Sequence, residues 1–257
     1  MVELNTHIPD RRGDYGIDGD FRVVSARGQA AIIAVILVVL LAVTVGAAVA
    51  GLLIVAVVAA LAALVLALSV ASYLWTTRVG KFQVWAEILA DLELRGDERV
   101  LDLGCGRGAV LLMAAQLLPQ GRAVGIDLWR ADQTGNGPEV TRRNAEREGV
   151  AGRVEVLTGD VTRLPFDDNT FDVVVSSLVL HNIDSASDRQ TAVDEAVRTL
   201  RPGGRLVIAD LLATGTYRDR LQALGISDAR QRNLGWRMWW LGPLMPTRLV
   251  TATKPPA

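Results

Sequence analysis

The residues best suited to chemistry lie in a glycine-rich loop and at one acidic position beyond it. Residues 99–103, Arg-Val-Leu-Asp-Leu, have the apolar character of a buried strand, and Gly104-Cys-Gly-Arg-Gly108 follows directly. Glycines let the backbone approach a ligand closely, and a helix expected over residues 109–118 offers free amide groups at its start. Asp127 ends a second strand nineteen residues beyond Gly108, where a carboxylate can accept both hydroxyls of a ribose. The combination predicts a site for an adenosine-containing cofactor.

The loop by itself leaves the kind of cofactor open. Gly104-x-Gly106-x-x-Ala109 also fits the dinucleotide pattern, so an NAD-dependent dehydrogenase remains an alternative on these residues alone. Metal chemistry has little to build on, because the chain has one cysteine, Cys105, and two histidines, His7 and His181. We therefore predict no metal site.

The elements that must position this loop alternate along the chain from about residue 80. Strands are expected at 99–103, 123–127, 154–157, 171–176 and 205–210, and helices at 84–94, 109–118, 138–148 and 188–200. This alternation predicts an α/β fold with an open, mostly parallel sheet and helices on both faces. Ligands bind such sheets at the carboxyl ends of the strands, which is where the glycine loop lies.

A long uncharged segment precedes this domain. Residues 28–77 contain no Asp, Glu, Lys, Arg or His, and 50 residues are enough for two membrane spans. We place the spans at residues 30–45 and 52–75, with a break in Gly46–Gly51. Helices of a soluble bundle would show a polar face, and these show none. The segment therefore predicts a transmembrane hairpin of two helices.

The charges beside the hairpin predict its orientation. The turn between the spans carries no basic residue, whereas basic residues lie on both outer flanks, at Arg11, Arg12, Arg22 and Arg27 before it and at Arg78 and Lys81 after it. The positive-inside rule places both flanks in the cytoplasm. We expect a multi-pass membrane protein with a mobile cytoplasmic tail (1–27), the hairpin (28–77) and a cytoplasmic domain (78–257).

Five motifs stand in register along that domain. They are Val100–Gly108, Gly125-Ile-Asp127, Thr158-Gly-Asp160, Leu164–Asp172 and Leu200–Leu206. Together they resemble the class I S-adenosylmethionine-dependent methyltransferases, most of all the small-molecule enzymes of the quinone-biosynthesis type, over about residues 82–254. The resemblance implies S-adenosyl-L-methionine as the cofactor and disfavours the dehydrogenase. It also implies a Rossmann-like, seven-stranded sheet, whose last two strands would be Asn233–Trp240 and Arg248–Lys254.

The resemblance assigns roles by position. It implies that the cofactor is held by Asp102, Gly104, Gly106 and Gly108 at the methionine half, by Asp127 and Leu128 at the ribose and adenine, and by Asp160 and Val161 at the adenine edge, with Ser176 and Ser177 at the transfer site. His181 follows the fourth strand beside the expected methyl donor, and a side chain with an ordinary pKa of about 6.5 suits a general base. An orienting or structural role for His181 is the alternative.

Three classes of function fit these features. The first is a membrane-anchored methyltransferase acting on a small lipophilic molecule or a lipid headgroup. The second is the same catalyst acting on a soluble metabolite, with the hairpin serving as an anchor or joining a homo-oligomer. The third is a non-catalytic adapter that binds the cofactor at the membrane. A nucleic-acid partner is disfavoured by the balance of 27 basic and 28 acidic residues.

Three further features stay open at the level of sequence. The methyl acceptor is one, including whether O, N, S or C is methylated. The connection after Asp127 is longer and richer in glycine than the family pattern, which leaves the contact of Trp129 undecided. In a strand, residues 236–240 would place Trp236, Met238 and Trp240 on one face, as a substrate wall, a headgroup contact or ordinary sheet packing.

Overall fold

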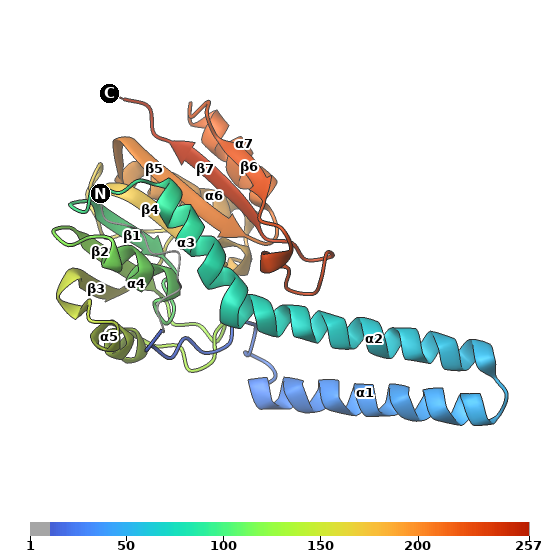
Figure 1. Ribbon diagram of the computed structural model, residues 1–257. Helices are drawn as coiled ribbons and strands as arrows, with labels where there is room; N and C mark the ends of the chain where they lie inside the picture. Colours follow the sequence, from blue (N-terminus) through green and yellow to red (C-terminus); the bar gives the residue numbers. More distant parts are fainter. Residues whose placement is uncertain (1–10, 257) are drawn as a thin grey trace.

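The computed structural model describes residues 11–256, which form two parts of different character (Figure 1). One part is a hairpin of two long helices, α1 (Ala26–Val49) and α2 (Leu53–Trp75), which pack side by side and project away from the rest. The other part is a β-sheet with helices on both faces. The π-helical turn Thr76–Gly80 joins α2 to α3 (Lys81–Asp91), the first helix of the second part.

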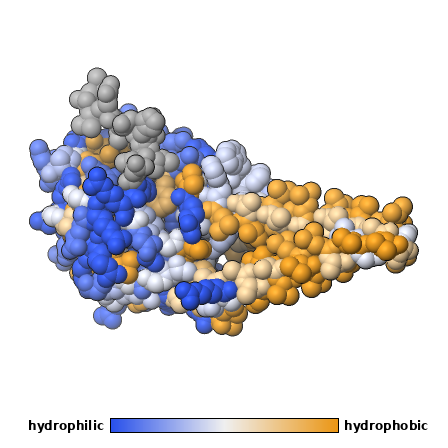
Figure 2. Space-filling view, turned by 60° about the horizontal axis from the view of Figure 1, so that its bottom comes forward, coloured by the Kyte–Doolittle hydropathy of each residue, from blue (hydrophilic) through white to orange (hydrophobic). Residues whose placement is uncertain are grey.

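The hairpin follows the uncharged segment of the sequence closely. Ser25 caps α1 by accepting from the amide of Gly28, and α1 continues through Gly46 before Gly51, at φ +77°, turns the chain. Both helices are long and apolar enough to cross a membrane by length and composition, and most of their large apolar side chains are exposed. Figure 2 shows this apolar surface against the mostly hydrophilic surface of the sheet-containing part.

The sheet has seven strands in the order β3-β2-β1-β4-β5-β7-β6, and β7 alone is antiparallel to its neighbours. The bounds are β1 (Arg99–Leu103), β2 (Arg122–Asp127), β3 (Val154–Thr158), β4 (Phe171–Ser177), β5 (Leu200–Asp210), β6 (Arg230–Asn233) and β7 (Arg248–Thr253). The Rossmann-like, seven-stranded and mostly parallel sheet expected from the sequence is confirmed. The order reverses between β1 and β4, so a ligand crevice is expected beyond the ends of these two strands.

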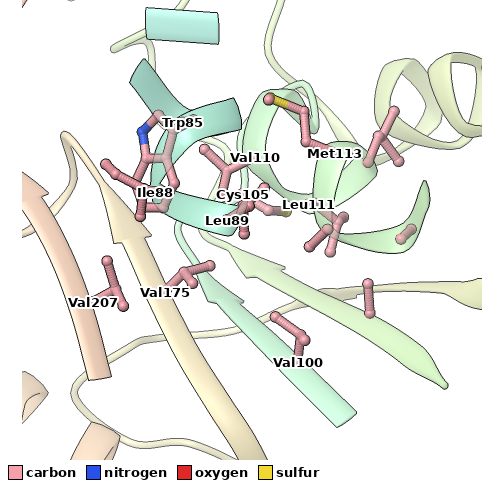
Figure 3. Packing of buried hydrophobic residues seen from close by; sticks show 14 of the residues in the cluster. Trp85, Ile88, Leu89, Val100, Cys105, Val110, Leu111, Met113, Val175 and Val207 are labelled. Carbon is pink, nitrogen blue, oxygen red and sulfur yellow. The ribbon is translucent and has the colours of Figure 1, made fainter. Parts of the chain in front are cut away.

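Strand alternation divides the core into two layers. Val100 of β1 belongs to the cluster under α3, α4 (Ala109–Gln116) and α5 (Pro138–Arg147). Its neighbour Leu101 belongs to the cluster under α6 (Ala186–Thr199) and α7 (Thr214–Ala223) on the other face. In Figure 3, Trp85 and Leu89 of α3 lie over the strands beside side chains of α4. This packing fixes α3, and with it the base of the hairpin, to the sheet.

The structure corrects the expected strand at Asn233–Trp240. β6 ends at Asn233, whose side-chain oxygen accepts from the amide of Gly235, and Gly235 itself has φ +77°. Residues 236–238 then form a short 3-10 helix. Met238 is fully buried and Trp240 nearly so, whereas Trp236 is mostly exposed and stacks on Trp75 at the end of α2. The three side chains therefore do not share one face.

The structure also differs from the expected mobile tail over residues 1–27. Residues 1–10 of that tail lie outside the described part of the chain. Residues 14–21, called the strap below, lie along the long connection after Asp127. The strap and this connection exchange backbone hydrogen bonds, from Gly19 to Asp132, from Phe21 to Ala131 and from Thr134 to Ile17. The polar composition predicted a tail without contacts to the domain, but the long connection supplies hydrogen-bond partners for the strap.

Candidate active site

Two adjoining cavities lie at the carboxyl ends of β1, β2 and β4. The main cavity has a volume of about 390 Å³ and the side cavity about 210 Å³. The main cavity is lined by the glycine loop, α3, the strap, the segment after β4 and residues of 240–245. Both cavities share the wall formed by Gly104, Asp127, Asp132, Val179 and Asn182. The pair can therefore hold one elongated ligand that passes Asp127.

The glycine loop forms the floor between the two cavities. Gly104 has φ +70°, and a Cβ there would lie 2.3 Å from the side chain of Val179, so only glycine fits. Gly106 lines the main cavity, but Gly108 lines neither and instead begins α4 with φ +88°. Of the three glycines expected to touch a cofactor, two thus face the cavities and the third sets the start of the helix.

Two buried carboxylates flank this floor. Asp102 is 2% exposed and lines the main cavity, and burial, with the nearby Asp127, raises its pKa well above the ordinary value. Asp127 accepts from the amide of Gly106 at 2.8 Å and from the amide of Trp129 at 2.6 Å. Burial raises the pKa of Asp127 as well, partly offset by these amides. The carboxylate of Asp127 thereby links the end of β2 to the glycine loop.

The remaining candidates for the adenosine half lie in the side cavity. Leu128, Asp160 and Val161 all line it, and the Asp160 carboxylate accepts from the amide and hydroxyl of Thr162. Trp129 lines neither cavity: its indole donates to Thr158 at 2.7 Å while its ring packs on the core. Trp129 is therefore anchored to the end of β3 and forms no part of either cavity wall.

The two serines at the end of β4 have separate positions. Ser176 is 1% exposed, donates to the carbonyl of Leu103 at 3.2 Å and lines neither cavity. Ser177 lines the main cavity and accepts from the indole of Trp85 at 3.0 Å. Alternation along the strand explains the difference, since successive side chains point to opposite faces. Of the two serines expected at the transfer site, Ser177 thus lines the main cavity and Ser176 does not.

His181 lines the main cavity and is held by a residue that the sequence analysis did not single out. Its Nδ1 lies 2.5 Å from Oδ1 of Asp210, and its backbone amide donates to Oδ2 at 3.0 Å. Asp210 is fully buried and also accepts from Tyr217 at 3.2 Å. Burial lowers the pKa of His181, but the hydrogen bond and charge of Asp210 outweigh it, so the pKa lies above its ordinary value. Asp210 ends the fifth expected strand, and its position at the end of that strand is the sequence feature that could have identified it.

The strap closes one side of the main cavity. Asp18 accepts from Lys81 at 2.5 Å, from Thr77 at 2.7 Å and from Gln133 at 2.9 Å. Lys81 is almost completely buried, so this ion pair joins the strap to the first turn of α3. The sequence showed no pattern for this contact, because the partners of Asp18 lie far from it along the chain, near the start of α3 and in the long connection.

Comparisons with known proteins agree on the kind of domain. Residues 101–208 match the family model described as a methyltransferase domain. Over 132 residues the chain is 35% identical to a ubiquinone/menaquinone biosynthesis C-methyltransferase of Dinoroseobacter shibae, covering 51% of this chain and 50% of that protein. It is 34% identical over 128 residues to an arsenite methyltransferase of Halobacterium salinarum, covering 49% of this chain and 30% of that protein. The matched residues 101–208 belong to a class I S-adenosylmethionine-dependent methyltransferase domain.

A solved structure supports the methyltransferase fold, and the family-model match leaves the hairpin aside. An S-adenosylmethionine-dependent methyltransferase from Aquifex aeolicus aligns with a TM-score of 0.51 at 20% identity, covering 66% of this chain and 88% of that one. The chain spans about half the length of the curated quinone-biosynthesis relatives it matches. The methyltransferase match begins at residue 101, beyond the strap and both hairpin helices.

Proposed function

We propose that this chain is a membrane-anchored methyltransferase that methylates a small, largely apolar acceptor with S-adenosylmethionine. One observation carries the proposal: a single cavity is bounded by the glycine loop on one side and by the base of the apolar hairpin on the other. Asp102, Gly104 and Gly106 line the first side, and Tyr73 of α2 and Trp240 line the second.

The residues present fit the cofactor. Gly104 leaves space that a Cβ would fill. Within the described residues, Asp102 is a buried acid with no salt bridge, a suitable partner for an amino group. Asp127 lies between the two cavities, where its carboxylate can accept ribose hydroxyls, and Leu128, Asp160 and Val161 surround the space for the adenine. When bound, the cofactor supplies an electrophilic methyl group on a sulfonium.

The other side of the main cavity suits an apolar acceptor. It is walled by aromatic and aliphatic side chains, namely Tyr73, Phe82, Trp85, Leu212, Trp240, Leu241 and Met245. Tyr73 and Trp240 pack edge to face with ring centres 5.9 Å apart. Burying an apolar acceptor here gains about 25 cal/mol for each Å² removed from water. His181 lies on the same cavity and is our candidate for the general base.

The hairpin supports the membrane part of the proposal. Its apolar side chains are exposed along both helices, which in water would be an unusually large apolar patch (Figure 2). Exposed Trp236, Leu241 and Leu244 continue this patch onto the domain beside the end of α2. We propose that residues 28–77 cross the bilayer with both ends cytoplasmic, so that the cavity of domain 78–257 opens near the headgroups.

Incubation of membranes carrying the full chain with methyl-labelled S-adenosylmethionine tests the proposal. We expect label in the lipid-soluble extract, and none with an Asp127→Ala variant at equal abundance. Label confined to water-soluble metabolites would favour an anchored enzyme for a soluble substrate. Cofactor binding without any transfer would favour the non-catalytic adapter, and either result contradicts the proposal.

A further inference from the structure

The side chain of His181 presents a single free ring nitrogen. Nδ1 is engaged by Asp210, which is the one hydrogen-bond contact that the ring makes among the described residues, so Nε2 is available to a ligand in the main cavity. Asp210 accepts four hydrogen bonds in total, from the ring and amide of His181, from the amide of Leu211 and from Tyr217. Because these hydrogen bonds hold the carboxylate of Asp210 in place, Asp210 fixes both the tautomer and the orientation of the His181 ring. Nε2 is then the ring nitrogen that can accept a proton.

The charges around the main cavity indicate what the acceptor should carry. Among the described residues that line it, Lys81 is the one lysine or arginine, and it is already paired with Asp18. An anionic acceptor would therefore lose its hydration there without gaining a counter-charge. The opposite wall is aromatic and aliphatic, which favours an uncharged apolar body.

We infer that the acceptor is an uncharged, apolar molecule that reacts through a hydroxyl group on an aromatic ring, and that His181 removes the hydroxyl proton while Asp210 acts as its positioning residue. The inference rests on the proposed function. An aromatic ring fits flat aromatic walls such as those of Phe82, Trp85 and Trp240. A hydroxyl is a weak nucleophile at neutral pH, and a fixed base makes it competent.

The step balances without any further reactant. The O–H bond breaks, the proton moves to Nε2 of His181, and the electron pair left on oxygen forms the new bond to the methyl carbon. The sulfur keeps the electron pair of the S–CH₃ bond that breaks and becomes a neutral thioether. The imidazolium formed is stabilised by the buried carboxylate of Asp210, and its proton then passes to water.

Titration of His181 is a test that does not depend on turnover. The chain has two histidines, so nuclear magnetic resonance of histidine-labelled full-length protein in micelles gives two signals, and His181→Gln assigns them. The titratable groups around His181 come from several elements. The carboxylates of Asp210 in β5 and Asp132 in the long connection act on the ring, and Tyr217 of α7 donates to Asp210. Arg130 and Arg189 donate to the backbone carbonyls of the next two residues, Asn182 and Ile183.

Asp210→Asn should lower the pKa of His181, because the charge that outweighs burial is gone while burial remains. It should also lower kcat by at least about tenfold, with little change in KM for the acceptor, since general-base catalysis supplies about 10²–10⁴-fold. Asp219→Asn is the matched control, because it removes the same charge from the exposed surface of α7 and should change neither value. A His181 pKa that does not move in Asp210→Asn overturns the positioning role.

A matched set of probes tests the acceptor class. We expect 4-octylphenol to be methylated at least about tenfold faster than the cationic 4-octylbenzylamine and the anionic 4-octylbenzoate. Faster reaction of the amine or the carboxylate overturns the inference but leaves the proposed methyltransferase standing. Failure of calorimetry to detect binding of the demethylated cofactor product would instead overturn the proposed function, whatever the probes show.

Discussion

The ion pair between Asp18 and Lys81 should decide whether the strap stays on the domain. The side chains of Asp18 and Lys81 are 17% and 4% exposed, and Asp18 also accepts from Thr77 and Gln133. Asp18→Ala leaves the lysine buried without a partner. Removing one member of a buried pair costs about 3–5 kcal/mol, and we take the lower value because Asp18 is partly exposed.

Amide hydrogen exchange in the strap measures this free-energy cost directly. The amides of Gly19 and Phe21 donate to Asp132 and Ala131 and exchange when the strap opens. A loss of about 3 kcal/mol predicts exchange about 100-fold faster at these amides in Asp18→Ala. Amides of β1 should be unchanged, because the sheet does not depend on the strap.

Two further variants separate the ion pair from a general loss of structure. Asp20→Ala alters the neighbouring, exposed pair with Arg22 and should leave exchange at Gly19 and Phe21 nearly unchanged. Asp18→Leu combined with Lys81→Met removes both charges and should restore most of the protection, since no buried charge is left unpaired. Exchange in Asp18→Ala within fivefold of the natural chain would refute the reasoning.

Three other predictions follow from single observations. Gly104→Ala should abolish cofactor binding, because the new Cβ would lie 2.3 Å from Val179 at φ +70°; unchanged affinity by calorimetry would contradict this. Burial raises the pKa of Asp132 to about 6, so its protonated form favours folding and that contribution is lost as pH rises toward and through 6. Asp132→Asn should therefore be more stable than the natural chain at pH 7.5 but not at pH 4, as measured by thermal melts. Reporters fused after residue 27, near residue 50 and at residue 257 should read cytoplasmic, outside and cytoplasmic, and an outside C-terminus would contradict the topology.

The sequence alone predicted the features that depend on local residue patterns. The βα alternation from residue 99 onward, the glycine loop and Asp127 were all predicted from apolar periodicity and spacing, and the structure places them where parallel-sheet topology requires. The uncharged run likewise predicted two helices with a break, although α1 extends through Gly46 to Val49 before the chain turns. Here the local signal and the fold agree.

The features that the sequence missed depend on contacts between distant segments. Asp210 and His181 are 29 residues apart and meet because β4 and β5 end at the same edge of the sheet. The strap resembled a free tail because its backbone partners lie more than 100 residues away, in the long connection after Asp127. The ion-pair partner of Asp18, Lys81, is 63 residues away. The segment Trp236–Trp240 had the composition of a strand, but Gly235 turns the chain and the end of α2 covers it instead.

Calorimetric titration of the full chain with the demethylated cofactor product, S-adenosylhomocysteine, tests the central assignment of the cavities most directly. Asp127→Ala removes hydrogen bonds to the ribose worth about 1.5–3 kcal/mol each, so we expect binding to weaken about 100-fold or more. Asp127→Asn keeps the shape of the side chain but can accept from only one of the two loop amides, so a thermal melt of each variant controls for loss of the fold. Asp219→Ala should bind normally. Equal affinity in Asp127→Ala and the natural chain, or tighter binding of a nicotinamide dinucleotide, would contradict the account.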